Sequence, residues 1–326
     1  MSRILLLFLG VLFLGAGLAA QPRYHQRADV QAFIREMVER HGFVERELQH
    51  LFAKVQRAEP ILEAIAAPRE KSRAWEDYRA SFITERRIAA GVEFWKRHRR
   101  SLERAEEKYG VAPEYVAAII GVETYYGRQM GKWRVVDALT TLAFDYPPRA
   151  PYFREELENY LLLSRDAGAD VFAARGSYAG AVGIPQFMPG STRRYAVDFD
   201  GNGRVDLLKS PTDAIGSVAN YLAAHGWTRG AVVMRPAIAS GERWRGFVGI
   251  EPRHALKEII DAGVSVEEVD AGPAVLVELE SPERPSELRV AFRNFYVITR
   301  YNRSAFYASA VHDLAVELRK AYDLGK

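Results

Sequence analysis

The stretch from Val111 to Gly127, VAPEYVAAIIGVETYYG, restricts the fold more than any other part of the chain. Pro113 suits the first position of a helix, since its missing N–H is not needed there and its fixed φ matches the helical turn. Ile119 and Ile120 lie on one face of that helix, and Glu123 falls on the same apolar stripe. The sequence therefore predicts a buried helix, running to a stop at Gly127, whose Glu123 side chain points inward.

Glu123 is the candidate reactive group of this helix. A carboxylate that faces apolar and aromatic side chains loses hydration, so its charged form is disfavoured and its pKa rises. A raised pKa is what a general acid requires near neutral pH. The alternative is that Glu123 lies at the edge of the stripe and reaches water, as most glutamates of amphipathic helices do.

The N-terminus has the pattern of a secretory signal peptide, which we predict over residues 1–20. Arg3 precedes an apolar run from Ile4 to Leu14, and small residues, among them Ala19 and Ala20, follow it. The run is short for a membrane span and has a cleavage-like end, so removal is favoured over an uncleaved anchor. No later segment is apolar enough to cross a bilayer, and we expect an exported protein without a stable membrane anchor.

Charge and rare residues argue against several classes of protein. The formal net charge is +3, and loss of Arg3 with the signal lowers it by one. A charge this close to balance does not indicate a basic surface that would bind nucleic acid. Cysteine is absent, which excludes disulfides and a lipid on an N-terminal cysteine. The 7 histidines form no HExxH pair, and a zinc enzyme is not expected.

Hydrophobic spacing predicts a mainly α fold with a small α+β domain. Residues 29–109 have a helical pattern throughout, and we interpret the run KRHRR at 96–100 as the solvated side of a helix rather than a site for an anionic polymer. After Trp227 the period shortens, and AVVMRPAIA, AVLVELES and SELRVAF predict strands around a helix near 254–262. The predicted boundaries are 21–108 for an N-terminal helical domain, 109–228 for a central core, 229–293 for the small α+β domain and 294–326 for C-terminal helices that return to the core.

The segment ARGSYAGAVGIPQFMPGSTRRYA differs in amino-acid composition from the predicted helices on either side of it. It is rich in glycine, small residues and aromatics, which suits a backbone that a ligand approaches closely. An ordinary tight connector is the alternative. Its candidate contact residues are Ser177, Tyr178, Gln186 and Phe187.

The segment DFDGNGRVD has the ligand pattern of a calcium loop. Oxygen groups stand at alternate positions, and Gly203 at the sixth position permits the sharp turn. The twelfth position, where a bidentate Glu normally closes the cage, is Lys209, and Asp213, at the start of a helix predicted over 213–224, is the nearest substitute. An Asp-rich turn without metal is the alternative. The pattern offers Asp198, Asp200, Asn202, the backbone carbonyl of Arg204, and Asp206.

Four long motifs together resemble one known family. They are GVETYYG, then GSYAGAVGIPQFMPGS, then DFDGNGRVDL with SPTDAIGSVANYLAAHGW, and finally NFYVITRYNRSAFYA. In this order they are similar to the membrane-bound lytic murein transglycosylase B family of peptidoglycan-cleaving enzymes, over most of the mature chain. The resemblance implies a lysozyme-like helical catalytic core, and cleavage of the β-1,4 bond between N-acetylmuramic acid and N-acetylglucosamine that leaves a 1,6-anhydro sugar.

The same resemblance implies roles for individual residues. Glu123 matches the single catalytic acid/base, and the calcium loop matches an EF-hand-like site closed by Asp213. The matched groove residues are Ser177, Gln186, Tyr221, Tyr301, Asn302 and Tyr307, and the matched metal ligands are Asp198, Asp200, Asn202, the carbonyl of Arg204, and Asp213. The implied partners are peptidoglycan glycan strands, with cell-wall synthesis or division proteins as further candidates. Because the lipid-bearing cysteine is missing, the implied form is a soluble periplasmic one with structural Ca²⁺.

One carboxylate is sufficient for this lyase reaction, whereas ordinary glycosidases need two. Two other functions remain open at this level. A hydrolytic muramidase would use water and a second acid such as Asp137 or Asp145. A glycan-binding scaffold would keep the cleft with little turnover, although such a protein has no need for a buried acid.

Overall fold

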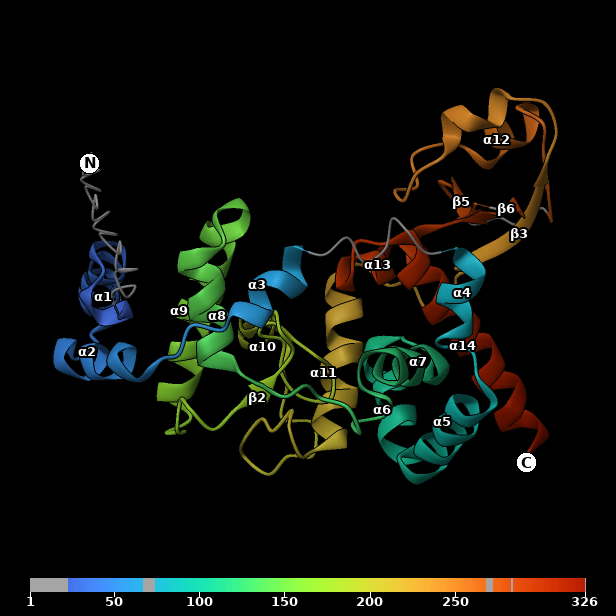
Figure 1. Ribbon diagram of the computed structural model, residues 1–326. Coiled ribbons are helices and arrows are strands. Elements are labelled where there is room, and N and C mark those ends of the chain that lie inside the picture. The colour runs from blue at the N-terminus through green and yellow to red at the C-terminus, as the bar shows by residue number, and fades with distance from the viewer. Residues whose placement is uncertain (1–22, 67–73, 268–271, 283, 326) are drawn as a thin grey trace, which may run out of the picture. The chain divides into compact units, whose positions relative to one another are not determined.

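A computed structural model describes residues 23–66, 74–267, 272–282 and 284–325 of the chain (Figure 1). The predicted signal peptide, residues 1–20, lies outside the described residues. The chain divides into two compact units, one ending at Val55 and the other beginning at Gln56. Among the described helices, none combines the length and the apolar character that crossing a membrane would require.

The first unit is a helical hairpin. A 3₁₀ turn, η1 (Tyr24–Gln26), leads into α1 (Ala28–His41) and α2 (Glu45–Lys54). Gly42 ends α1 because it adopts φ 67°, a left-handed conformation that glycine enters without steric cost. The two helices meet through Phe33 and Phe52, whose rings pack edge to face at 6.1 Å.

Four helices are described ahead of the central helix of the second unit, in residues 56–66 and 74–109. They are α3 (Glu59–Ala66), α4 (Trp75–Ala80), α5 (Glu85–Arg97) and α6 (Arg99–Tyr109). Thr84 caps α5 by accepting a hydrogen bond from the Arg87 amide at 3.2 Å. The Lys and Arg residues of the 96–100 run are exposed at the junction of α5 and α6, as a solvated face requires, and His98 is half-buried.

Helix α7 (Pro113–Thr124) lies at the centre of the second unit. Its residues from Val116 to Gly121 are all buried, because a helix that is apolar on every side must be enclosed by its neighbours. Helix α14 (Ala305–Leu324) runs antiparallel beside it. The pairs Glu114–Arg319 and Glu123–Tyr307 join opposite ends of the two helices. Helices α11 (Pro211–Ala224) and α13 (Arg293–Tyr301) complete the surroundings of the catalytic candidate.

A second group of helices lies between residues 135 and 195, and its last helix falls within the glycine-rich segment. It consists of α8 (Val135–Asp145), the 3₁₀ turn η2 (Pro147–Arg149), α9 (Ala150–Asp166) and α10 (Pro189–Tyr195). Strands β1 (Trp133–Arg134) and β2 (Arg175–Gly176) form a short antiparallel ribbon at the entry to that segment. Buried Glu156 of α9 accepts the Gly190 amide at 2.7 Å, which ties the start of α10 to α9.

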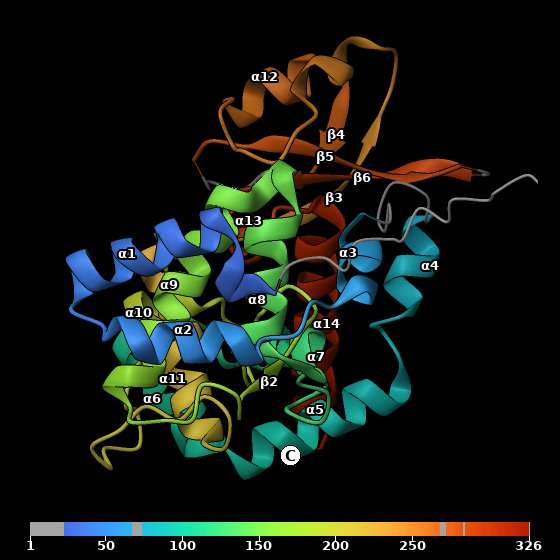
Figure 2. The same cartoon turned by 60° about the vertical axis from the view of Figure 1, so that its left-hand side comes forward.

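The small α+β unit is built on one antiparallel sheet in the order β4-β3-β6-β5. Its elements are β3 (Met234–Ala239), the 3₁₀ turn η3 (Arg243–Phe247), α12 (Leu256–Asp261), β4 (Val264–Val266), β5 (Val275–Ser281) and β6 (Arg284–Ala291). Strand residues alternate between faces: Val275 and Val277 join the main core, while Leu276 joins a smaller core under α12. Figures 1 and 2 both show α12 on the face of the sheet away from α14.

The structure departs from the predicted elements at two places. Helix α7 ends at Thr124 instead of continuing to Gly127, because Tyr125 and Tyr126 both adopt positive φ. Strand β4, only three residues long, was not predicted, since its length is too short for an alternating pattern to stand out.

Candidate active site

Glu123 lies in the last turn of α7, half-buried and within reach of solvent. Its Oε1 accepts a hydrogen bond of 2.6 Å from the Tyr307 hydroxyl on α14. Burial raises the pKa of Glu123 to about 7, and the Tyr307 hydrogen bond offsets part of that rise. Within the described part of the chain, no Lys, Arg or His forms an ion pair with Glu123. The acid is therefore desolvated without a charged partner.

The turn behind Glu123 is conformationally strained. Tyr125 and Tyr126 have φ 52° and 61°, and side-chain-bearing residues at such angles cost roughly 1–2 kcal/mol each. Backbone hydrogen bonds hold them, from the Tyr125 amide to the Gly121 carbonyl at 3.1 Å and from the Tyr126 amide to the Ile120 carbonyl at 3.3 Å. Strain of this kind persists only where the surroundings determine the conformation.

Arg87 of α5 supports this turn, and sequence reasoning missed it. Its Nη1 donates to the Gly121 carbonyl, and its guanidinium lies over the Tyr125 ring at 4.9 Å. Arg87 Nε and the Tyr126 hydroxyl are buried without hydrogen-bond partners in the described residues. No local signal could have identified Arg87, because its partners lie more than thirty residues away in a run with many other arginines.

Thr124 joins the end of α7 to the glycine-rich segment. Its hydroxyl donates to the Ile184 carbonyl at 2.8 Å and accepts the Gly127 amide at 2.9 Å. Gln186, two residues after Ile184, has φ 50°, and its side-chain amide donates to the Gly183 carbonyl at 2.8 Å and the Met130 carbonyl at 3.2 Å. The glycine-rich segment is thus anchored directly behind Glu123.

Two other features of this segment explain its composition. A Cβ on Gly183 would lie 2.5 Å from the Leu207 carbonyl oxygen, so only glycine allows this close approach to the segment that follows the Asp-rich loop. Ser177 accepts hydrogen bonds from the amides of Ala179 at 3.2 Å and Ala181 at 3.1 Å. In this structure its hydroxyl therefore organises its own turn.

A row of aromatic rings extends from Glu123. Tyr307 and Tyr301 are 6.5 Å apart, and Tyr301 and Tyr221 are 5.0 Å apart between ring centroids. Phe187 lies beside Tyr301 at 5.7 Å. The Tyr301 hydroxyl donates to the Pro185 carbonyl and that of Tyr221 to the Arg300 carbonyl, each at 2.6 Å. These two hydroxyls hold the backbone, while that of Tyr307 holds the acid.

Burial keeps the tyrosines next to Glu123 protonated. Loss of hydration raises the pKa of Tyr301 and of Tyr307 well above the usual value, and the charge of Glu123 adds to the effect. Asn302 follows Tyr301 with its side chain exposed, and Tyr178 is half-buried in the glycine-rich segment. The structure therefore brings Glu123, Tyr307, Tyr301, Tyr221 and Gln186 into one connected region, with Asn302 at its edge.

The two acids considered as second carboxylates are both engaged by arginines. Asp137 of α8 accepts from Arg134 Nε at 2.6 Å and from the Gln56 amide at 3.1 Å. Asp145, at the other end of α8, pairs with Arg57 at 3.2 Å. In the described residues, neither carboxylate has a hydrogen bond with Glu123.

The candidate metal centre lies between the glycine-rich segment and α11. Carboxylate oxygens of Asp198, Asp200 and Asp213 all lie within 4.8 Å of one another. Fully buried Asp213 also accepts the amides of Phe199 and Asp206, each at 2.8 Å. Asp213, rather than Asp206, is thus the third carboxylate of the group.

The loop around this group is shaped by the acids themselves. Asp198 accepts the amides of Gly201 at 2.8 Å and Gly203 at 2.7 Å. Loss of hydration acts to raise the pKa of Asp198, but these amides outweigh it and hold the pKa below its usual value. Asn202 accepts the Arg204 amide at 3.1 Å. Three carboxylates, with the amide of Asn202 beside them, offer the oxygen ligands that fit a hard cation such as Ca²⁺.

Comparison with known proteins agrees with these features. Residues 25–316 match the family model for the transglycosylase SLT domain. The membrane-bound lytic murein transglycosylase B of Escherichia coli K12 is 40% identical over 88% of this chain and 81% of its own length. The crystal structure of soluble lytic transglycosylase SltB1 from Pseudomonas aeruginosa has a TM-score of 0.84 and 46% identity, covering 90% of this chain and 99% of that one.

A third likeness bears on the metal centre. The structure of the Escherichia coli lytic transglycosylase Slt35 in complex with calcium has a TM-score of 0.82 and 40% identity, covering 90% of this chain and 93% of that one. These structures confirm the predicted fold class, mainly helical with a lysozyme-like core and a small α+β unit. With a match over most of its length, the chain belongs to the transglycosylase SLT domain family of lytic murein transglycosylases.

Proposed function

We propose that this protein is a lytic murein transglycosylase in which Glu123 is the single general acid and base. It cleaves the β-1,4 bond between N-acetylmuramic acid and N-acetylglucosamine and leaves a 1,6-anhydro end. The observation that carries the assignment is the environment of Glu123: its pKa is raised to about 7 by burial, and among the described residues no cation pairs with it. A carboxyl group in that state can hold a proton at neutral pH and release it to a substrate.

The reaction proceeds in two steps that use the same carboxyl group. Neutral Glu123 gives its proton to the glycosidic oxygen as the bond to the anomeric carbon breaks, and the substrate's 2-acetamido oxygen stabilises that carbon. The C6 hydroxyl of the same sugar then attacks the anomeric carbon, and ionised Glu123 takes the hydroxyl proton. The acid is regenerated, and no water is consumed. Because the nucleophile is already part of the bound sugar, its proximity favours ring closure over hydrolysis.

The neighbouring residues position the acid and the sugar. Tyr307 fixes one oxygen of Glu123 and leaves Oε2 to address the substrate. Gln186 ties the glycine-rich segment to Met130 in the loop after α7, and Tyr301 ties it to α13, so the walls of the groove keep their places. Ser177, Tyr221 and Asn302 are the further groove residues of the proposal, with the exposed amide of Asn302 suited to sugar hydroxyl or acetamido groups.

A bound Ca²⁺ would stabilise the loop behind the groove. Asp198, Asp200 and Asp213 would supply carboxylate oxygens, with Asn202 and the Arg204 carbonyl as further ligands. The ion would lie away from the bond being cleaved and fix the segments on both sides of the loop. Calorimetry of the chelator-treated chain with added CaCl₂ checks this: binding and a raised melting temperature are expected, and Asp213→Asn should abolish both.

The proposal includes where the protein works and what it meets there. A cleaved signal at residues 1–20 would deliver it to the periplasm, where glycan strands of peptidoglycan are its substrate. Cell-wall synthesis or division proteins are its candidate partners. N-terminal sequencing of the protein secreted into the periplasm, with cleavage near Ala20 expected, tests the first of these statements.

The decisive test is product analysis on purified peptidoglycan. Mass spectrometry of muropeptides released by the mature protein should show 1,6-anhydro ends, and Glu123→Gln should lower their rate of release by at least about a thousandfold, because an amide has no proton to give. Glu114→Gln is the matched control on the same helix, where the carboxylate pairs with Arg319 instead of facing the groove. Reducing ends would establish a muramidase, and full activity of Glu123→Gln would refute the assignment.

A further inference from the structure

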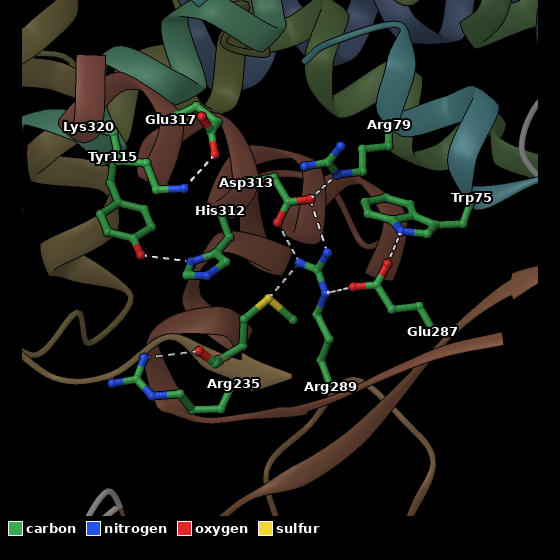
Figure 3. Close-up of polar contacts among 11 residues, drawn as sticks. Trp75, Arg79, Tyr115, Arg235, Glu287, Arg289, His312, Asp313, Glu317 and Lys320 are labelled. Atoms are coloured by element: carbon green, nitrogen blue, oxygen red, sulfur yellow. Dashed lines mark hydrogen bonds and ion pairs between the residues drawn. The ribbon is translucent and has the colours of Figure 1, made fainter. Parts of the chain in front are cut away.

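A second cavity lies near the other end of α7, where the sheet of the small α+β unit meets α14 and α4 (Figure 3). Its volume is about 270 Å³. It is distinct from the groove at Glu123, since its lining includes none of the residues described there. The lining residues are Arg79, Met234, Arg235, Pro236, Glu287, Arg289, His312, Asp313, Val316 and Glu317.

The acidic groups of this cavity are already used as acceptors. Both oxygens of Asp313 accept from Arg289, at 2.6 and 3.0 Å, and one also accepts from Arg79 Nε at 2.6 Å. Glu287 accepts from Arg289 at 2.7 Å and from the Trp75 indole at 2.8 Å. Figure 3 shows these groups as one continuous network. Loss of hydration acts to raise the pKa of Asp313, but the two arginines outweigh it and lower the pKa, so this carboxylate stays ionised.

The hydrogen-bond donors, in contrast, are not all used. The Tyr115 hydroxyl lies 2.9 Å from His312 Nδ1, the one hydrogen bond of that hydroxyl in the described residues. A buried hydroxyl needs an acceptor, so Tyr115 donates to Nδ1 and the ring proton of neutral His312 is on Nε2. Nε2 has no hydrogen-bond partner in the described part of the chain. Burial lowers the pKa of His312 to about 4, which agrees with a neutral ring.

Arg79 adds a second unused donor group. Its Nε is bound to Asp313, while the two terminal nitrogens of its 41% exposed side chain have no hydrogen bonds within the described residues. Arg235 stands on the opposite side, where Nη1 makes only a long bond of 3.4 Å to the Met234 carbonyl and Nε is 3.2 Å from Glu267. The unused hydrogen-bonding groups of the cavity are therefore donors, and two of them belong to cationic side chains.

We propose that this cavity binds the terminal carboxylate of a peptidoglycan peptide stem, which is an inference that rests on the proposed function. A carboxylate accepts several hydrogen bonds and pairs well with guanidinium groups. The imidazole Nε2–H and the guanidinium groups of Arg79 and Arg235 would supply the donors. Tyr115 lies eight residues before Glu123 on α7, which is about 12 Å along the helix. The site would thus hold a stem while the acid addresses the glycan.

Binding of a synthetic stem tetrapeptide to the full chain carrying Glu123→Gln tests the proposal without turnover. Labelling with ¹⁵N-histidine makes His312 a reporter, assigned through His312→Gln. The free-carboxylate peptide should shift the His312 Nε2 signal saturably, and the same peptide with a C-terminal amide should bind at least about tenfold more weakly. Arg79→Gln should weaken binding of the first peptide to a similar degree, whereas Arg97→Gln, which removes an exposed arginine paired within α5, should not.

The remaining outcomes contradict the proposal. Equal binding of the free-carboxylate peptide and its C-terminal amide would show that the cavity does not recognise the carboxylate. Peptide-induced shifts of other histidine signals without a shift of the His312 signal would show the same. Sodium acetate producing the same shift at the same concentration would mean that any small carboxylate suffices and would overturn the assignment to a stem. These results are independent of Glu123, so a failure here is distinguishable from a failure of the proposed lyase activity, which the anhydro-product analysis reports.

Discussion

The regions at the two ends of α7 differ in whether a buried carboxyl group has a charged partner. Near its start, Tyr115 touches His312, whose neighbour Asp313 is paired with Arg289 and Arg79. Near its end, Glu123 has the neutral hydroxyl of Tyr307 as its hydrogen-bond partner, and the described residues place no cation in an ion pair with it. Both carboxylates lose hydration, yet the pKa of Asp313 is lowered while that of Glu123 is raised to about 7. The partner, not the burial, decides which way the pKa moves.

The difference shows how one core supports both stability and reactivity. The Asp313 network joins β6, α4 and α14, so its ionised groups hold the small α+β unit on the helices. At Glu123, compensation by a cation would keep the acid ionised and unable to donate a proton. Glu123 can therefore stay neutral only if no cation lies beside it. The strained backbone of Tyr125 and Tyr126 adds a conformational energy cost at the same end of α7.

The largest expected effect on stability comes from breaking the paired region. Asp313→Asn removes the charge that compensates buried Arg289, and loss of one partner of a buried pair costs roughly 3–5 kcal/mol. Denaturant unfolding should show this loss at pH 7. Asp261→Asn, at an exposed pair with Lys257, is the control and should change the free energy of unfolding by less than about 0.5 kcal/mol. Equal effects of the two substitutions would remove the basis of the comparison.

Removing the unpaired charge should have the opposite sign. The pKa of Glu123 is about 7 when folded against a usual 4.5, so the folded state holds a proton that the unfolded chain releases between these values. Stability from this group is therefore lost as the pH rises from about 4.5 to about 7, by up to about 3 kcal/mol. Glu123→Gln should be more stable than the parent at pH 8 and much closer to it at pH 5. Thermal unfolding at both values measures this, and a destabilised variant at pH 8 would argue against the account.

A smaller effect is expected from the support behind the acid. Arg87→Met keeps much of the packing on Tyr125 but loses the hydrogen bond to the Gly121 carbonyl. We expect kcat to fall about tenfold, or about 1.4 kcal/mol, with KM nearly unchanged, because the acid is misplaced and the groove is not. The neighbouring Arg86→Met, whose side chain is exposed, is the control. A change in KM alone would assign Arg87 to substrate binding instead.

The smallest effect concerns Tyr307. Its hydroxyl hydrogen bond stabilises ionised Glu123, so Tyr307→Phe should raise the pKa of Glu123 further. Activity that needs the protonated acid is lost as the pH rises through this pKa, and the alkaline limb of kcat/KM should move to higher pH by less than about one unit. Tyr301→Phe should leave the limb in place, because that hydroxyl donates to the Pro185 carbonyl. A shift to lower pH in Tyr307→Phe would contradict the assigned direction.

Much of the fold could be predicted because it depends on local patterns. The apolar spacing of α7, the alternation in β5 and β6 and the helix after Ser210 are all visible in short stretches. The turn after Glu123 could not be predicted, since tyrosine has no tendency towards positive φ and the conformation is imposed by contacts from α5 and the glycine-rich segment. Strand β4 was missed for its shortness.

The residues of the candidate site also divide into those that a local pattern marks and those that depend on distant contacts. Glu123 could be singled out from its place on an apolar stripe, and the calcium-loop pattern pointed to Asp198 and Asp200 from spacing alone. Arg87 and Thr124 act through partners far away in the chain, so no local pattern marks them. Tyr307 was expected in the groove, but its direct bond to Glu123 depends on the antiparallel packing of α14 on α7.

The most direct test of the central claim is the pKa of Glu123 itself. Carbon-13 NMR of the mature protein with labelled glutamate, followed from pH 3 to pH 9 and assigned through Glu123→Gln, reports the carboxyl group without substrate. We expect a titration midpoint of about 7 for this one resonance. A midpoint near 4.5 would mean that Glu123 is ionised at neutral pH and that burial without a charged partner does not make it the acid.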